Sequence, residues 1–258
     1  MAINVNTVYQ TVLLILNKEQ RGYITPTEFN NLGDQVQLEI FEKYFEDLNQ
    51  QIRVPQTDTD YADRVKNLDE KIAIFKTFGD ANYISQTVSA TNTTLTYWTL
   101  PSLDNYGNQV TFYRLGTVLY NNEVELQRLD RHEFYHVNKS LLTKPSKTFP
   151  VYLYEDNKLF IKPTTIATQG DIQIDYIRKP VNPIWGFDVG SLGQYVYNSN
   201  IYNISTSPSG SVNFELHMSE QTNLILQILK YAGVIIKDPQ LVQDAAQQVA
   251  INEQNEKI

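Results

Sequence analysis

The sequence predicts an α+β protein in which a helical body, formed by both ends of the chain, carries an inserted antiparallel β-domain. Apolar residues recur at helical spacing up to Phe78, alternate by two over much of residues 93–178, and are helical again from Glu220. Seventeen Tyr and eleven Phe, against eleven Gly, favour a substantial β component. Too little helix separates the strands for parallel βαβ units.

The first two helices are predicted from spacing and from a start signal. Val5–Lys18 places its apolar residues on one side. The second helix covers Thr25–Arg53, with Thr25 as the cap, Pro26 at the first helical position and Glu28 able to reach back to the cap. Two rows of apolar residues follow, so this helix is expected to pack from two sides.

Three more helices are predicted. One covers Tyr61–Phe78 and ends at Gly79, the place for a left-handed residue. Glu220–Ile236 is apolar enough to be largely buried. A last, Gln-rich helix is expected from Gln240 to about Glu253, after a second cap-plus-proline start.

The central part of the chain has the period of two that is typical of strands. Asn121-Asn122 and Asp156-Asn157 tolerate positive φ and indicate two hairpins. The predicted strands are Thr93–Leu100, Val110–Tyr120, Glu123–Leu129, Val151–Tyr154, Lys158–Ile161 and Asp171–Arg178.

These elements predict three parts: a helical part over 1–82, a β-rich insert over 83–213, and a helical pair over 214–258 that packs on the first part. Residues 181–213, rich in Asn, Ser, Gly and Pro, are expected to form an extended loop or a loose β-hairpin within the insert. Such a long polar excursion is usually functional or ordered by a partner.

Composition narrows the function classes. The net charge of −8 and pI near 4.9 argue against a protein that wraps nucleic acid, because phosphate contacts need Lys and Arg. The absence of Cys excludes disulfides and thiolate chemistry. No stretch has the length of a membrane span or the pattern of a signal peptide. We therefore expect a product made in the cytoplasm, without a membrane partner or a cofactor.

One motif suggests catalysis. His132, Glu133 and His136 match H-E-x-x-H, which on a helix places two zinc ligands on one face with the Glu as candidate base. Asp130 and Asn138 stand where zinc peptidases have uncharged and hydrophobic residues, and no residue is marked as third ligand. The alternative is a short surface turn attached to the sheet by its apolar residues.

The aromatic residues of 185–202 suggest a second alternative function. They could stack on sugars, as in a carbohydrate-binding tail or spike protein, although packing or subunit contacts are the commoner use of such residues. No phosphate-binding loop, nucleophile elbow or paired carboxylates support another enzyme class. We expect no enzyme.

Four stretches carry a resemblance to a known family. NKEQRGYITPTEFN (17–30), running into QLEIFEKYFEDLNQQIR (37–53), resembles head-to-tail connector proteins of crAss-like and related Bacteroidetes-infecting phages. FPVYLYEDNKLFIKP (149–163) and IDYIRKP (174–180) are similar to the β-domain of phage adaptor, or tail-tubular-A, proteins. The C-terminal FELH, followed by an apolar helix, DP and a Gln-rich helix, also resembles the adaptors.

The resemblance implies a structural subunit of a virion neck ring, stacked below the portal protein and touching other neck or tail proteins. A closed ring repeats one heterologous interface, and the resemblance implies about twelve copies. An acidic protein would suit a channel through which genomic DNA slides without specific binding.

The helices supply candidate residues for the contact between neighbouring subunits. Phe41 and Phe45 belong to the second apolar row of Thr25–Arg53, and the sequence leaves open whether they are core or interface. The narrow apolar edge of the last helix supplies the other candidates: Leu241, Val242, Ala245 and Val249.

Overall fold

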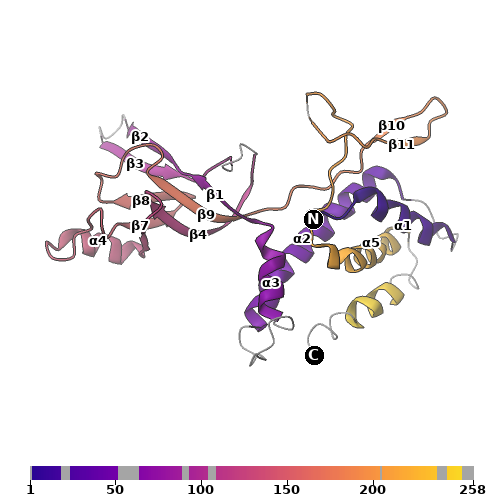
Figure 1. Cartoon of the computed structure of the whole chain (residues 1–258), viewed down its shortest axis with the longest axis horizontal. Helices are drawn as coiled ribbons and strands as arrows, with labels where there is room; N and C mark the ends of the chain where they lie inside the picture. Colours follow the sequence, from indigo (N-terminus) through magenta and orange to yellow (C-terminus); the bar gives the residue numbers. More distant parts are fainter. Residues whose placement is uncertain are drawn as a thin grey trace. The chain divides into compact units, whose positions relative to one another are not determined.

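The structure, a computed structural model, confirms an α+β fold (Figure 1). It describes residues 2–18, 24–51, 64–88, 93–103, 109–203, 205–236 and 243–251. The chain forms two compact units, which we call the helical unit (1–74 and 180–258) and the β unit (75–179). Both ends of the chain therefore share one unit, and the β unit is inserted between them.

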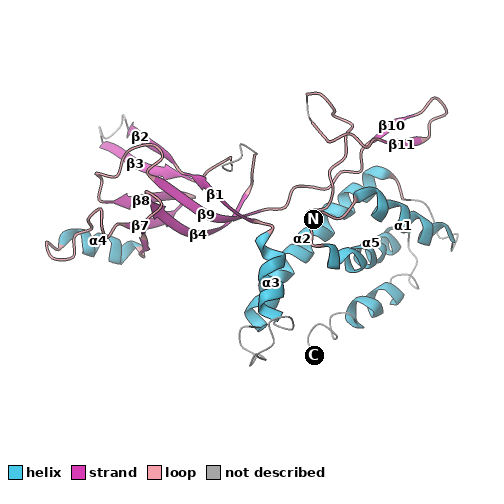
Figure 2. Ribbon diagram, viewed as in Figure 1, coloured by secondary structure: helices cyan, strands magenta, loops and turns pink. Residues whose placement is uncertain are grey.

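The helical unit is built around α2, which packs against α3 and α5, while α1 packs against α5. Figure 2 separates these helices from the strands by colour. The elements are α1 (Val5–Lys18), α2 (Pro26–Gln51), α3 (Arg64–Ala73), the 3-10 helix η1 (Met218–Glu220), α5 (Gln221–Ile236) and a helix over residues 243–251.

The predicted third helix is wrong at its C-terminal end. Helix α3 ends at Ala73, and the chain continues into strand β1 (Lys76–Asp80). Gly79, expected as the end of the helix, pairs with Ile174 in a sheet. Helical spacing of Phe75 and Phe78 misled the prediction because a short apolar run fits a strand as well as a helix.

The start of α2 has the predicted capping box. The Thr25 backbone N–H donates to Glu28 Oε2 at 2.9 Å, the Thr25 hydroxyl donates to the same oxygen at 2.7 Å, and the Glu28 N–H donates back to Thr25 Oγ1 at 3.3 Å. The hydrogen bond from the Thr25 backbone N–H lowers the pKa of Glu28 below its ordinary value, and the bond from the Thr25 hydroxyl lowers it by a smaller amount.

A buried ion pair joins the two chain segments that make up the helical unit, residues 1–74 and 180–258. Lys71 of α3 places its Nζ 2.5 Å from Oε1 of Glu220, whose side chain is 5% exposed. Asn223 donates to the other carboxylate oxygen at 3.2 Å. The Lys71 ammonium also lies 5.7 Å from the ring centre of Tyr44 in α2. Three segments that are distant in sequence therefore meet at one charge pair.

Polar side chains of α2 bind the chain where it returns from the β unit. Gln37 is fully buried; its amide donates to the Val181 carbonyl at 2.8 Å and accepts from the Glu215 N–H at 3.0 Å. Asn30 accepts from the Trp185 N–H at 2.8 Å and donates to the Trp185 carbonyl at 3.3 Å. These bonds satisfy backbone groups that a loop would otherwise leave to water.

These contacts correct the predicted domain boundaries. The insert was expected over 83–213, but the β unit covers 75–179 and the stretch 181–213 belongs to the helical unit. Composition alone suggested a projecting loop, whereas Trp185 is buried and the α2 amides hold the backbone beside it. The expected loose hairpin is present: β10 (Phe187–Val189) pairs antiparallel with β11 (Tyr195–Tyr197).

The β unit contains two sheets, with strand orders β1-β9-β4-β5 and β2-β3-β8-β7-β6. Neighbouring strands are antiparallel except β6 and β7. Strand β2 was not predicted. The strand bounds after β1 are β2 (Asn82–Val88), β3 (Thr93–Thr99), β4 (Phe112–Tyr120), β5 (Val124–Glu125), β6 (Gln127–Arg128), β7 (Val151–Glu155), β8 (Lys158–Lys162) and β9 (Ile172–Arg178).

Both predicted hairpins are present. Asp156 and Asn157, with φ of 52° and 54°, link β7 directly to β8. Asn121 and Asn122, with φ of 50° and 60°, link β4 to β5, but the loop has Glu123 as a third residue because Tyr120 pairs with Val124. Asn and Asp tolerate this left-handed conformation better than other non-glycine residues.

The two sheets share one hydrophobic core. Alternation along β9 buries Ile172, Ile174 and Tyr176, as predicted, and these side chains cluster with Trp98 of β3 and Leu159 of β8. Since β9 belongs to one sheet and β3 and β8 to the other, the cluster holds the sheets together.

We expect Thr25→Ala to lower the free energy of unfolding by about 1 kcal/mol near neutral pH, because both bonds of the Thr25 hydroxyl are lost while the bond from its backbone N–H remains. The cost should shrink as the pH falls through the lowered pKa of Glu28, since the carboxylate that accepts both Thr25 bonds becomes protonated. Chemical denaturation followed by circular dichroism measures both. Thr27→Ala, an exposed change in the same turn, should cost nothing; an equal loss in both variants contradicts the prediction.

We expect Lys71→Met to destabilise the chain by about 3 kcal/mol, because it leaves a buried carboxylate without its cation. The double variant Lys71→Met/Glu220→Met should recover most of this loss, since replacing a whole buried pair by apolar residues is often near neutral. Denaturation curves of the three proteins test this. A double variant no more stable than the single one would refute the proposed cost of the orphaned carboxylate.

Candidate functional site

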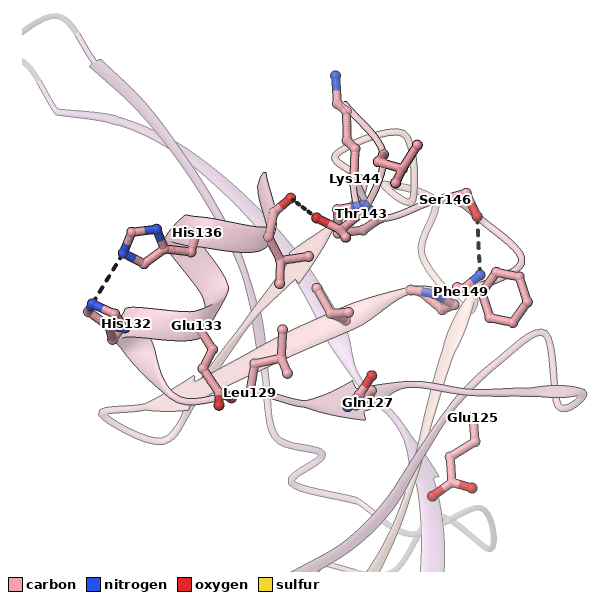
Figure 3. A pocket seen from close by; sticks show the side chains of 15 residues that line it. Glu125, Gln127, Leu129, His132, Glu133, His136, Thr143, Lys144, Ser146 and Phe149 are labelled. Atoms are coloured by element: carbon pink, nitrogen blue, oxygen red, sulfur yellow. Dashed lines mark hydrogen bonds between the residues drawn. The ribbon is translucent and has the colours of Figure 1, made fainter. Parts of the chain in front are cut away.

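The two histidines of the H-E-x-x-H stretch lie side by side on helix α4 (Arg131–Lys139) of the β unit. Four-residue spacing puts His132 and His136 on one face, and both are exposed. Their Nε2 atoms are 3.1 Å apart and their ring centres 4.3 Å apart (Figure 3). The structure therefore brings these two predicted residues together.

The third residue of the motif is not part of this arrangement. In Figure 3 the Glu133 side chain extends away from the two rings, towards Leu129. Among the residues that the structure describes, no group of three or more His, Asp, Glu or Cys side chains could hold a metal ion. The remaining histidine, His217, is in the helical unit and caps η1 by accepting from the Ser219 N–H. The geometry does not provide the ligands and base of a zinc peptidase.

Packing fixes the orientation of α4. Phe134 is buried in a small cluster with Leu129, Val151 and Leu153, and Val137 packs against it. Attachment to the sheet by Leu129, Phe134 and Val137 is what the sequence suggested, although the segment is a nine-residue helix and not a turn.

An ion pair adds a polar attachment for α4. Arg131 binds the Glu155 carboxylate through two nitrogens, with Nε 2.8 Å from Oε1. The donated hydrogen bond lowers the pKa of Glu155 and raises that of Arg131. The Arg131 side chain is 67% exposed and that of Glu155 31%, so solvent weakens this pair, which orients the start of the helix more than it stabilises the fold.

An open cavity of about 700 Å³ lies beside α4. Figure 3 shows its lining side chains, with the two histidines at one end and Phe149 at the other. The lining mixes apolar residues such as Leu142 with Glu125, Glu133 and Lys144. Nothing in it pairs a nucleophile with a base, so the cavity is a candidate for binding rather than for catalysis.

The loop over residues 140–150, which forms one side of this cavity, exposes large apolar side chains. Leu141 is 98% exposed, Leu142 97% and Phe149 77%. Single exposed apolar residues are ordinary, but three in ten residues concentrate apolar surface at one place. We call Leu141, Leu142 and Phe149 the leucine loop.

The tyrosine-rich stretch of the helical unit is organised around Trp185. This residue is 5% exposed and donates from Nε1 to Asn6 Oδ1 at 3.0 Å. Its ring stacks on Phe187 and Tyr197, with ring centres 5.9 and 5.6 Å away, and lies 4.3 Å from that of Tyr9. Trp185 thus anchors the stretch to α1, and it is too buried to serve as a platform for a sugar.

The outer part of the same stretch exposes apolar residues. Leu192, at the turn between β10 and β11, is 90% exposed, and Ile201 is 85% exposed. Val189 and Val196, on the two strands, are also exposed. We call these four residues the hairpin patch. Because Val189 pairs with Tyr195 and Val196 with Asp188, the two valines lie on opposite faces of the hairpin, so these apolar residues are exposed at several places around the aromatic cluster.

Four of the six predicted interface residues are buried in the structure. Phe41 and Phe45 are 0% and 6% exposed, and their rings pack edge to face at 5.2 Å. Ala245 and Val249 are also buried within the single chain. These four candidates are therefore corrected to core residues, which a neighbouring subunit cannot reach. Leu241 and Val242 lie outside the described residues.

Comparison of the sequence with known protein families and with curated proteins finds no match. Among the described helices, none is both long enough and apolar enough to cross a membrane.

Sequence reasoning missed the leucine loop and the hairpin patch, although both have a signal. Leu142 has no aliphatic or aromatic partner at helical or strand spacing, and Leu192 stands alone in Gly-Ser-Leu-Gly. A large aliphatic residue without a periodic partner in a turn-rich segment cannot be buried by its own element. Such residues are candidates for contact with another molecule.

Proposed function

We propose that this protein is a structural subunit of a phage virion neck, where its copies form a closed ring between the portal and the tail. The motifs at 17–53, 149–163 and 174–180 support this through their resemblance to connector and adaptor proteins. The ring encloses the path of the genomic DNA and touches other neck or tail proteins.

The observation that carries the proposal is that each of the two units exposes several large apolar side chains. The leucine loop belongs to the β unit and the hairpin patch to the helical unit. A ring needs a heterologous contact, in which two different surfaces of the chain meet on neighbouring copies. The proposal commits both patches to contacts between copies of this chain.

The chemistry of the described residues supports a structural role. They include no metal-binding group of three ligands, and the H-E-x-x-H stretch lacks its base in place. The net charge of −8 suits a channel that DNA passes through without adhering to it, because acidic side chains repel phosphates.

Electron micrographs of the purified chain test the proposal. We expect closed rings of one rotational symmetry, because the same interface is repeated until it closes. Analytical ultracentrifugation over a range of concentrations gives the copy number in solution. A chain that stays monomeric at every concentration, both alone and mixed with its portal protein, would show that it is not a ring subunit.

Leu142→Asp should weaken the ring without unfolding the chain, because the side chain is 97% exposed and supports no core. We expect at least a ten-fold higher concentration for half-assembly, corresponding to about 1.4 kcal/mol per contact. Thr148→Asp adds the same charge to an exposed position of the same loop and should assemble as the unaltered chain does. Equal assembly of both variants would remove the leucine loop from the interface.

A further inference from the structure

His132 and His136 are positioned to share one ligand atom. Their Nε2 atoms approach to 3.1 Å, closer than the 4.3 Å between the ring centres, so the rings converge at the nitrogen end. Both rings are exposed on α4, and Figure 3 shows no other side chain of the cavity lining between them. An ion from solution can therefore reach both nitrogens.

The separation of the two nitrogens matches the geometry of a chelated metal ion. First-row ions bind imidazole nitrogen at about 2.0–2.1 Å, so two nitrogens on one ion are about 3.3 Å apart at the tetrahedral angle. At the right angle of a square-planar or octahedral site, the same bond length gives about 2.9 Å. The observed 3.1 Å lies between these values. The distance between the two nitrogens is therefore already that of a chelate.

The support of the pair is rigid. Phe134, between the two histidines in sequence, is buried against the sheet, and Arg131 is bound by Glu155 at the start of the helix. The metal site thus rests on a helix fixed from two sides, and the ligands lose little freedom on binding.

We propose that His132 and His136 form a two-histidine chelate for a divalent first-row transition-metal ion of the zinc, nickel or copper class. Imidazole is a preferred ligand of these ions, whereas magnesium and calcium prefer oxygen. Water fills the remaining positions, because the described residues supply no third protein ligand. The site binds and does not catalyse, and it is independent of the proposed ring.

The same two atoms can also form a hydrogen bond between neutral rings, in which one Nε2 donates and the other accepts. At an exposed position water competes for both groups, so that bond contributes little. To bind a metal ion, both rings must carry their proton on Nδ1, so that each Nε2 offers its lone pair to the ion. The two uses differ in a measurable way, because only the chelate needs an added ion.

Calorimetric titration of the untagged chain with zinc chloride tests the proposal. We expect one ion per chain and at least a ten-fold loss of affinity in His136→Ala, since even residues that only support a ligand are worth about ten-fold or more. His136 is exposed and alanine favours helix, so this variant should fold, which circular dichroism checks. His217→Ala removes the histidine of η1 and should bind zinc as the unaltered chain does.

Two further measurements sharpen the result. Electron paramagnetic resonance with copper(II) chloride should show coupling to two nitrogens, reduced to one in His132→Ala. Glu133→Gln should retain full zinc affinity, because this side chain points away from the pair. The proposal is overturned if the chain binds no zinc, if His136→Ala binds as tightly as the unaltered chain, or if Glu133→Gln abolishes binding.

Discussion

The buried ion pair between Lys71 and Glu220 is the constraint on which the helical unit depends. The chain leaves this unit soon after α3 and returns at Pro180, so a contact between α3 and η1 must close a loop that contains the whole β unit. Closing a long loop costs entropy, and short-range propensity cannot repay it. The pair fixes where the two segments meet, because separating its charges would leave a buried carboxylate unpaired, and Tyr44 of α2 lies against the ammonium. The buried amide of Gln37 performs the same task for the returning chain through the Val181 carbonyl.

The structural features that the sequence predicted are those whose physical cause lies within a few residues along the chain. The capping box of α2 and the Asp156-Asn157 turn involve residues within a few positions of one another, and both were predicted. Alternation along β9 identified its buried face because the pleat alone fixes it. The end of α3 was missed because Gly79 pairs with Ile174, a partner almost a hundred residues away that no local pattern reveals.

The candidate sites also divide into those that local spacing predicts and those that depend on tertiary structure. Spacing of four residues placed His132 and His136 on one face of a helix, which needs no tertiary information. Whether Phe41 and Phe45 were core or interface could not be decided from the sequence, because both fates require an apolar residue. In the structure both side chains are buried within the single chain, so they are core residues. Leu142 shows the converse: a loop residue with no periodic partner stays exposed, and the surface left behind is what a second copy can cover.

The orientation of α4 explains why a peptidase motif is present without a peptidase site. Successive helical residues are about 100° apart, so Phe134 lies nearly opposite the midpoint between His132 and His136. Because Phe134 packs into the sheet, the histidine face must point to solvent, and Glu133 lies on the flank. Figure 3 places the two histidines at one end of the open cavity, with Glu133 directed away from them. One buried aromatic side chain therefore decides which face of α4 is open to solvent, and that face is the one with both imidazoles.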